Sequence, residues 1–151
     1  MKKLLKEEYR SYLHEINLEN TLSVSLTMKQ RIGFEKLDDI NACQNFRHFM
    51  NLLNCSVYGN AYKRYQRRLG VVPVLENSLN NRLHYHLVLE RPAFIALNEF
   101  KEIIACSWGK TKFGYGEIDI QNIYSDGWID YITKFKFSED QVDLVNCHWN
   151  H

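Results

Sequence analysis

The chain has 151 residues and a mass of 18.0 kDa, which is the size of one domain. Apolar residues make up 45% and charged residues 25%, which excludes a disordered tail, a collagen-like rod and a low-complexity linker. The 19 Lys and Arg nearly balance the 18 Asp and Glu, so bulk charge gives no indication of a nucleic-acid partner. No apolar run has the roughly 18–20 residues that cross a membrane, and the charged start does not resemble a signal peptide. We therefore expect an intracellular protein without a membrane partner.

The four cysteines form no C-x-x-C pair; they are Cys43, Cys55, Cys106 and Cys147. This spacing argues against a zinc ribbon or a disulfide scaffold and favours reduced, buried thiols in a cytoplasm-like compartment. The last five residues, from Cys147 to His151, include two histidines that could bind a metal adventitiously. Chain ends commonly fray, so we expect a frayed terminus here.

The first predicted element is a strand over Thr21–Thr27, where apolar residues alternate with hydroxyl residues in the period-2 pattern of a half-buried strand. The side chains of its polar face are Ser23, Ser25 and Thr27. A helix follows, which Asp38 or Asp39 can cap. Its apolar stripe continues as far as Tyr65, and Gly70 ends the helix or its extension.

The second half of the chain begins with a hairpin, because residues 71–76 and 82–90 read as strands on either side of a polar turn. Pro92 opens a second helix, and Gly109 ends it. Residues 115–123 alternate again as a strand, and a last helix runs from Gly127 to about Phe137. This order predicts an α+β fold of ferredoxin-like type, with an antiparallel sheet of four to five strands and helices packed on it.

A candidate metal site lies on the predicted hairpin. His84 and His86 are two residues apart on one strand and therefore share a face, while Glu76 ends the preceding strand and returns beside them. A histidine pair alone is a weak motif, and Glu76 also fits an ordinary exposed carboxylate. Two imidazoles and a carboxylate, with positions left open, are typical of a catalytic site. Oxygen ligands favour Mg²⁺ or Mn²⁺, although imidazole would also accept Zn²⁺, Co²⁺ or Ni²⁺.

A candidate nucleophile lies on the predicted last helix. Tyr131 and Lys134 are three residues apart and share a face. A tyrosine hydroxyl with a pKa near 10 needs a cation or a base beside it to attack at neutral pH. Lys134 could supply that, or could neutralise charge that develops on a phosphate. An exposed pair on a surface helix is the alternative.

A basic segment, Lys63-Arg64-Tyr65-Gln66-Arg67-Arg68, places four cations in six residues. Such a segment is either a solvated helix face or a surface that contacts phosphates and stacks on bases. With the polar strand, it supplies the candidate DNA contacts, which are Ser23, Ser25, Thr27, Tyr62, Lys63, Arg64, Arg67 and Arg68.

Three motifs in this order resemble the HUH endonucleases: the polar strand over residues 23–27, His84-Tyr85-His86 on a strand, and Tyr131-Ile132-Thr133-Lys134 on a late helix. More narrowly, they resemble the rolling-circle replication initiator (Rep) proteins of phages, plasmids and single-stranded DNA viruses. The likeness spans about residues 21–137, so the whole chain, residues 1–151, would be a single HUH domain without a helicase domain.

The resemblance implies a ferredoxin-like or RRM-like core with the histidine strand central to the sheet. It also implies a metal, Mg²⁺ or Mn²⁺, held by both histidines and a third polar ligand, for which Glu76 matches the family's glutamate. The family's nucleophile maps onto Tyr131 and its motif lysine onto Lys134, and Phe135 stands where two-tyrosine members have a second tyrosine.

This family resemblance implies sequence-specific nicking and joining of single-stranded DNA through a covalent 5′-phosphotyrosine. The reaction would start rolling-circle replication at an origin, with a host polymerase and helicase as partners. The compartment would be the cytoplasm of a bacterium or an infected host, or the nucleus for a eukaryotic virus.

Three alternatives stay open. The first is another tyrosine HUH enzyme, either a single-tyrosine transposase or a relaxase. The second is a nucleic-acid-binding module that does not cut. The third is a metal-dependent hydrolase that uses bound water and forms no adduct.

Overall fold

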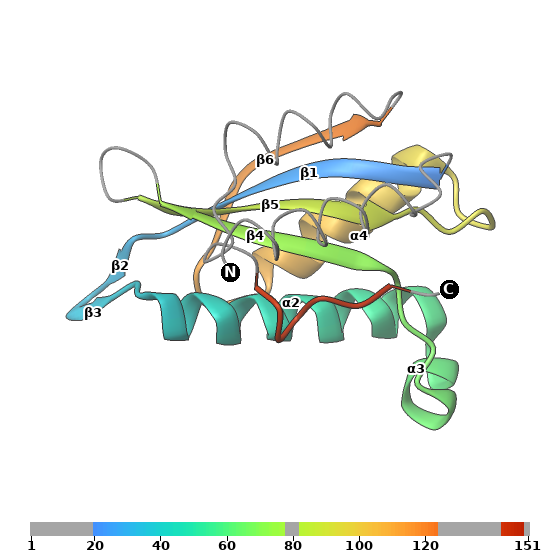
Figure 1. Cartoon of the computed structure of the whole chain (residues 1–151), viewed down its shortest axis with the longest axis horizontal. Coiled ribbons are helices and arrows are strands. Elements are labelled where there is room, and N and C mark those ends of the chain that lie inside the picture. The colour runs from blue at the N-terminus through green and yellow to red at the C-terminus, as the bar shows by residue number, and fades with distance from the viewer. Residues whose placement is uncertain (1–19, 78–81, 124–142, 150–151) are drawn as a thin grey trace, which may run out of the picture.

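The computed structural model describes residues 20–77, 82–123 and 143–149. It confirms the α+β prediction (Figure 1). Four antiparallel strands form one sheet in the order β4-β5-β1-β6. Their bounds are β1 Thr21–Met28, β4 Val71–Asn77, β5 Leu83–Glu90 and β6 Gly114–Asn122. The histidine strand, β5, is therefore one of the two inner strands of the sheet.

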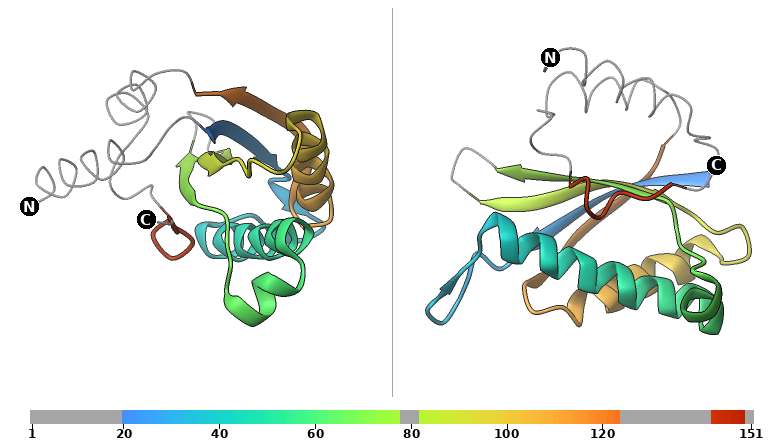
Figure 2. Two further views of the ribbon diagram at one scale, coloured as in Figure 1. Left: turned by 90° about the vertical axis from the view of Figure 1, so that its right-hand side faces the viewer. Right: turned by 60° about the horizontal axis from the view of Figure 1, so that its bottom comes forward.

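The described helices are α2 Asp39–Tyr58, α3 Asn60–Tyr65 and α4 Leu97–Gly109. Both long helices, α2 and α4, cover the same face of the sheet (Figure 2). The core lies between them and the sheet, where Phe46 stacks on Tyr85 with ring centroids 4.4 Å apart. Phe49 meets Trp108 edge to face at 5.3 Å. All four rings are fully buried, which fixes the α2 face of β5 firmly against the helices.

Capping residues in the sequence determine where α2 begins and ends. Asp38 is the N-cap, and it forms a reciprocal capping box with Asn41, which satisfies two backbone donors of the first turn. The helix ends at Gly59, whose φ of 56° is in the region that favours glycine. The apolar stripe therefore does not run through one continuous helix to Tyr65. Helix α2 ends at Gly59, and the chain changes direction there into the short α3.

Further details differ from the predictions. The prediction of buried thiols is wrong, because Cys106 is exposed and the other three cysteines are only partly buried. A small hairpin, β2 Arg31–Ile32 with β3 Glu35–Lys36, lies between β1 and α2 and was not predicted. The helix expected from Pro92 begins at Leu97, after a turn over residues 93–95. The last helix predicted over residues 127–137 lies outside the described residues.

The expectation of a frayed C-terminus is wrong for residues 143–149, which lie beside β4. The backbone of Val71 exchanges two hydrogen bonds with His148, and the amide of Asp143 donates to the carbonyl of Pro73 at 3.0 Å. The ring of Trp149 packs on Gly70, where an added Cβ would come within 2.7 Å of it. These contacts place the described C-terminal segment between the edge of the sheet and α2, as Figure 2 also shows.

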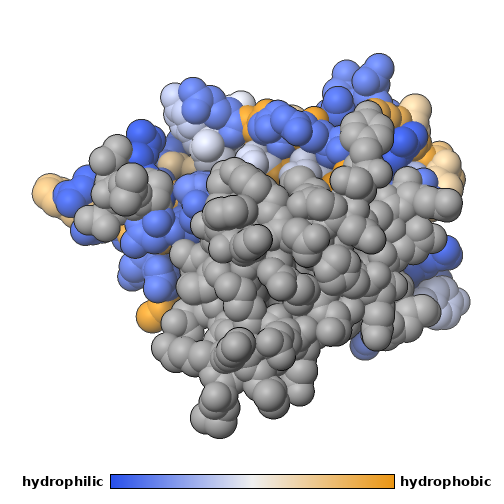
Figure 3. Space-filling model, turned by 45° about the horizontal axis from the view of Figure 1, so that its top comes forward, coloured by the Kyte–Doolittle hydropathy of each residue, from blue (hydrophilic) through white to orange (hydrophobic). Residues whose placement is uncertain are grey.

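The visible surface of the described residues is largely hydrophilic, with apolar residues in separate small areas (Figure 3). Exposed large apolar side chains such as Phe34 and Phe94 lie in separate turns, one between β2 and β3 and the other between β5 and α4. Within the described ranges, no helix has the length and apolar character needed to cross a membrane.

Candidate metal centre

Strand register brings the three predicted ligands together. On β4 and β5, Glu76 pairs directly with His84, and Val74 pairs with His86. Because side chains alternate along a strand, Glu76, His84 and His86 all project from the face opposite α2 and α4. The β4–β5 hairpin thus aligns one carboxylate and two imidazoles on rigid backbone, as the sequence predicted.

The three ligand atoms converge on one point. Glu76 Oε2 lies 3.2 Å from His84 Nε2 and 2.8 Å from His86 Nε2, and the two imidazole nitrogens are 3.1 Å apart. The side chains are only 19–23% exposed. Within the described ranges, this is the one group of three such side chains that could hold a metal ion.

The far side of each imidazole has a hydrogen-bond partner. His86 Nδ1 lies 2.9 Å from Ser25 Oγ, and His84 Nδ1 lies 3.4 Å from the carbonyl oxygen of Arg82. A carbonyl oxygen can only accept, so the Arg82 contact favours a proton on Nδ1 of His84 and a lone pair on its Nε2. Partners of this kind orient metal-bound imidazoles in many proteins.

The donor set fits a divalent cation. Three lone-pair atoms about 3 Å apart repel one another unless a cation or a shared proton lies between them. With protons alone, one imidazole can donate to Glu76 and to the other ring, so the same distances also fit a hydrogen-bonded triad. A metal would satisfy all three atoms together and leave its remaining positions open, as in catalytic sites.

The other predicted residues of β1 lie on the same face. Ser25 pairs with His86 on one side and with Asp119 of β6 on the other. Thr27 pairs with His84, and its hydroxyl donates to the carbonyl of Glu117 at 2.6 Å. Ser23 lies two residues further along, opposite Val88. The predicted polar strand therefore borders the candidate metal centre.

The structure does not bring the basic segment to this centre. Tyr62, Lys63 and Arg64 belong to α3, which lies beyond the opposite end of β4, and Arg67 and Arg68 follow it (Figure 1). Val71, at the start of β4, is five residues from Glu76, which corresponds to about 16 Å of strand. The predicted nucleophile Tyr131 and its neighbour Lys134 lie outside the described residues.

Sequence reasoning missed a polar cluster beneath β5. Tyr85 projects from the helix face between the two histidines, and its hydroxyl donates to Asp143 Oδ2 at 2.9 Å. Burial and the neighbouring Asp143 carboxylate raise the pKa of Tyr85. The same causes raise the pKa of Cys43, whose thiol also faces Asp143. Only the alternation of β5 could have signalled Tyr85, because its partner is 58 residues away in the sequence.

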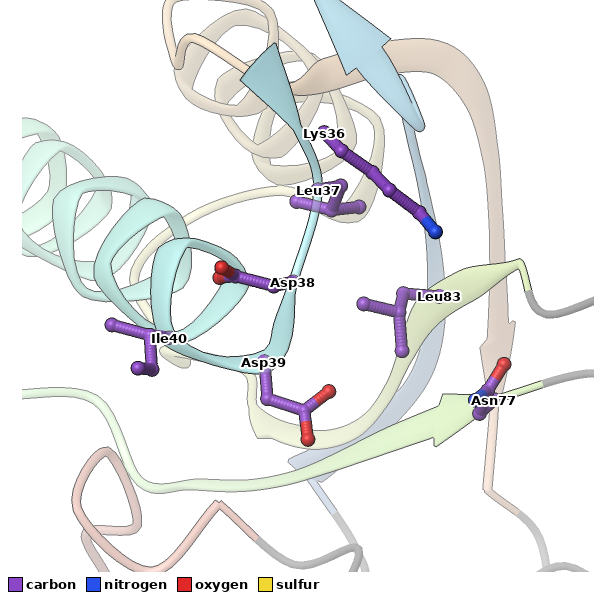
Figure 4. Close-up of a pocket in the computed structure, with 7 residues that line it drawn as sticks. All are labelled: Lys36, Leu37, Asp38, Asp39, Ile40, Asn77 and Leu83. Atoms are coloured by element: carbon purple, nitrogen blue, oxygen red, sulfur yellow. The ribbon is translucent and has the colours of Figure 1, made fainter.

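A wide pocket lies next to this hairpin on the helix side (Figure 4). It has a volume of about 630 Å³ and is lined by Lys36, Leu37, Asp38, Asp39, Ile40, Asn77 and Leu83. Asn77 and Leu83 directly follow Glu76 and precede His84, but their side chains alternate to the other face. The pocket therefore adjoins the candidate metal centre without sharing its ligands.

Comparison with known proteins finds no family model that matches the chain, and no curated protein or solved structure with significant similarity.

Proposed function

We propose that the protein is a metal-dependent enzyme that nicks and joins single-stranded DNA through a tyrosine, as a rolling-circle replication initiator of the HUH type does. The observation that carries the proposal is the convergence of Glu76, His84 and His86 on an inner strand of an antiparallel sheet. The motif order of the sequence supports it further, since Tyr131 and Lys134 follow the sheet as they do in that family.

The spacing of the ligand atoms favours Mg²⁺ or Mn²⁺. Adjacent ligands of an octahedral ion with bonds of about 2.1 Å are about 3.0 Å apart. Tetrahedral zinc with similar bonds places its ligands about 3.4 Å apart. The three separations of 2.8, 3.1 and 3.2 Å agree better with the octahedral ion. When bound, such an ion supplies Lewis acidity toward a phosphate oxygen.

The covalent chemistry would belong to Tyr131. Its hydroxyl oxygen forms a bond to phosphorus as the bond from phosphorus to the 3′ oxygen breaks, and the released 3′ oxygen takes up a proton. The products are a 5′-phosphotyrosine and a free 3′-OH for a host polymerase. Lys134 would stabilise the tyrosinate or the phosphate charge. The reverse reaction rejoins strands without ATP, because the phosphodiester energy is conserved.

The test is a denaturing gel of the full chain with single-stranded oligonucleotides, covering random sequence and candidate origins, plus Mn²⁺. We expect a heat-stable protein–DNA band that EDTA, His86→Ala and Tyr131→Phe each abolish. Tyr115→Phe is the matched control, since Tyr115 is an exposed tyrosine on β6. It should leave the band unchanged.

Other outcomes separate the alternatives. Metal-dependent cleavage without an adduct would replace the proposal with a hydrolase that uses water. Oligonucleotide binding without cleavage, unaffected by EDTA and by Tyr131→Phe, would replace it with a binding module. Rejoining into a duplex target, but not at an origin, would favour a single-tyrosine transposase.

A further inference from the structure

A second pocket, with several polar lining residues, also lies on the helix side of the sheet, between α2 and the C-terminal segment. Its volume is about 220 Å³, and α2, the chain around α3, the start of β4 and residues 145–148 line it. Two of its lining residues, Arg47 and Arg68, are arginines, and His148 is a third basic residue. Among the described residues that line it, none is Asp or Glu. The pocket therefore favours an anion.

The α2 wall presents hydrogen-bond donors in a row. Arg47, Asn51 and Asn54 are four and three residues apart, so they project from one side of the helix into the pocket. Asn51 Oδ1 accepts from the hydroxyl of Tyr62, which leaves the amide nitrogen of Asn51 as a donor. Within the described ranges, Arg47 forms no ion pair.

Asn54 is the most informative residue of this wall. It is only 3% exposed, and its Oδ1 accepts from the backbone amide of Leu69 at 2.8 Å. Its amide nitrogen makes no hydrogen bond in the described part of the chain. Since no fully enclosed side-chain nitrogen or oxygen there lacks a partner, this NH₂ group keeps some accessible surface, and Asn54 lines the pocket. The group is therefore a donor that an acceptor in the pocket can use.

The opposite wall holds its arginine in place. The guanidinium of Arg68 lies over the ring of Tyr62, 5.9 Å from its centroid, and Tyr62 is itself tied to Asn51 of α2. This stacking limits the rotamers of Arg68 before a ligand arrives, which lowers the entropy cost of binding. A planar guanidinium also matches two oxygens of a phosphate.

We propose that this pocket binds a phosphate group, held by Arg47, Arg68 and the amide of Asn54. The proposal does not depend on the metal centre. The pocket is on the helix side of the sheet and contacts Val71, whereas Glu76 is five residues further along β4 on the other face. A mononucleotide or the backbone of a nucleic acid could supply the phosphate, since both present the same oxygens.

The test is isothermal titration of the full chain in EDTA with inorganic phosphate, a nucleoside 5′-monophosphate, and oligothymidylate with phosphodiester or neutral methylphosphonate linkages. We expect saturable phosphate binding that Arg47→Gln and Arg68→Gln each weaken by about tenfold, since each removes a charged hydrogen-bond donor. Asn54→Asp keeps the acceptor for Leu69 and puts a negative charge in the pocket, so it should abolish binding.

Arg31→Gln is the matched control, because it removes one charge at an exposed arginine of β2 that does not line the pocket and is not a candidate DNA contact. It should weaken binding by less than about twofold. Tighter binding of the phosphodiester than of the methylphosphonate oligomer would identify a nucleic-acid backbone, and binding of the monophosphate alone would identify a small phosphate ester. The proposal fails if none of the phosphate-bearing probes saturates, if Arg31→Gln weakens binding as much as Arg47→Gln, or if folded Asn54→Asp binds normally.

Discussion

On β5, side chains that alternate between the two faces of the sheet meet very different surroundings. His84 and His86 lie with Glu76 on one face, the polar face, where the three side chains are about one-fifth exposed and within hydrogen-bonding distance of one another. Tyr85, between them, is fully buried against Phe46 on the other face, the packed face, which α2 and α4 cover. The packed face holds the strand rigid, so the polar face can keep three ligand atoms about 3 Å apart without a loop to position them.

We expect the largest effect, on metal affinity, when a ligand of the polar face is removed. His86→Ala removes one of three ligands, so the affinity for Mn²⁺ should fall by about 100-fold or more. Isothermal titration measures it. His48→Ala is the control, because His48 is an exposed histidine on α2 away from the centre, and it should bind Mn²⁺ normally. Equal affinities in the two variants would contradict the assigned ligands.

We expect the next largest effect, on stability, when a hydrogen bond on the packed face is removed. Tyr85→Phe keeps the ring on Phe46 but removes the donor to Asp143, which should lower the free energy of unfolding by about 1–3 kcal/mol. Urea denaturation measures this change. Because Tyr85 does not point to the ligands, Mn²⁺ affinity should stay within about twofold. A large loss of metal affinity with no loss of stability would show that the two faces are not separate.

The packed face also predicts a pH dependence. Burial and the Asp143 carboxylate raise the pKa of Tyr85 above its usual value of 10.0, so the folded state holds the phenolic proton more tightly than the unfolded state. This contribution is fully present below pH 10.0 and is lost as the pH rises above it. The slope is at most about 1.4 kcal/mol per pH unit. Urea denaturation between pH 9 and 11 should show a shallower decline in Tyr85→Phe, and identical slopes would refute Tyr85 as the source of this pH dependence.

We expect the smallest effect, again on metal affinity, when a hydrogen-bond partner of a ligand on the polar face is removed. Ser25→Ala removes the partner of His86 Nδ1, so Mn²⁺ affinity should fall by about tenfold. Ser23→Ala is the matched control, since Ser23 lies on the same face of β1 but opposite Val88. It should leave the affinity unchanged. If the two variants behave alike, Ser25 does not orient the imidazole.

Much of the polar face could be predicted from the sequence, because the patterns that position its residues extend over only a few neighbouring residues. The alternation of β1 and β5 and the few residues of sequence between Glu76 and His84 were sufficient to place these side chains next to one another and to His86. The Asp38 cap and the end of α4 at Gly109 were also local signals. Periodicity of this kind depends only on neighbours within a few residues.

The contacts of the packed face and the second pocket, beside α2, could not be predicted from the sequence, because they join segments that are far apart in it. Asp143 meets Tyr85 and Cys43 across 58 and 100 residues, and no pattern near any of them signals the contact. The pairing of His148 with Val71 likewise overrode the usual fraying of a chain end. The end of α2 at Gly59 could not be predicted, because the apolar stripe of the sequence continues past this glycine. The basic segment therefore begins on a separate helix, α3, away from the metal centre.

The most direct test of the metal centre is electron paramagnetic resonance of the purified full chain titrated with Mn²⁺. The geometry of Glu76, His84 and His86 predicts one bound ion per chain, with electron spin echo modulation from two imidazole nitrogens. The double variant with His84→Ala and His86→Ala should lose both the ion and the modulation. A bound ion without nitrogen modulation, or full binding by the folded double variant, would contradict the centre.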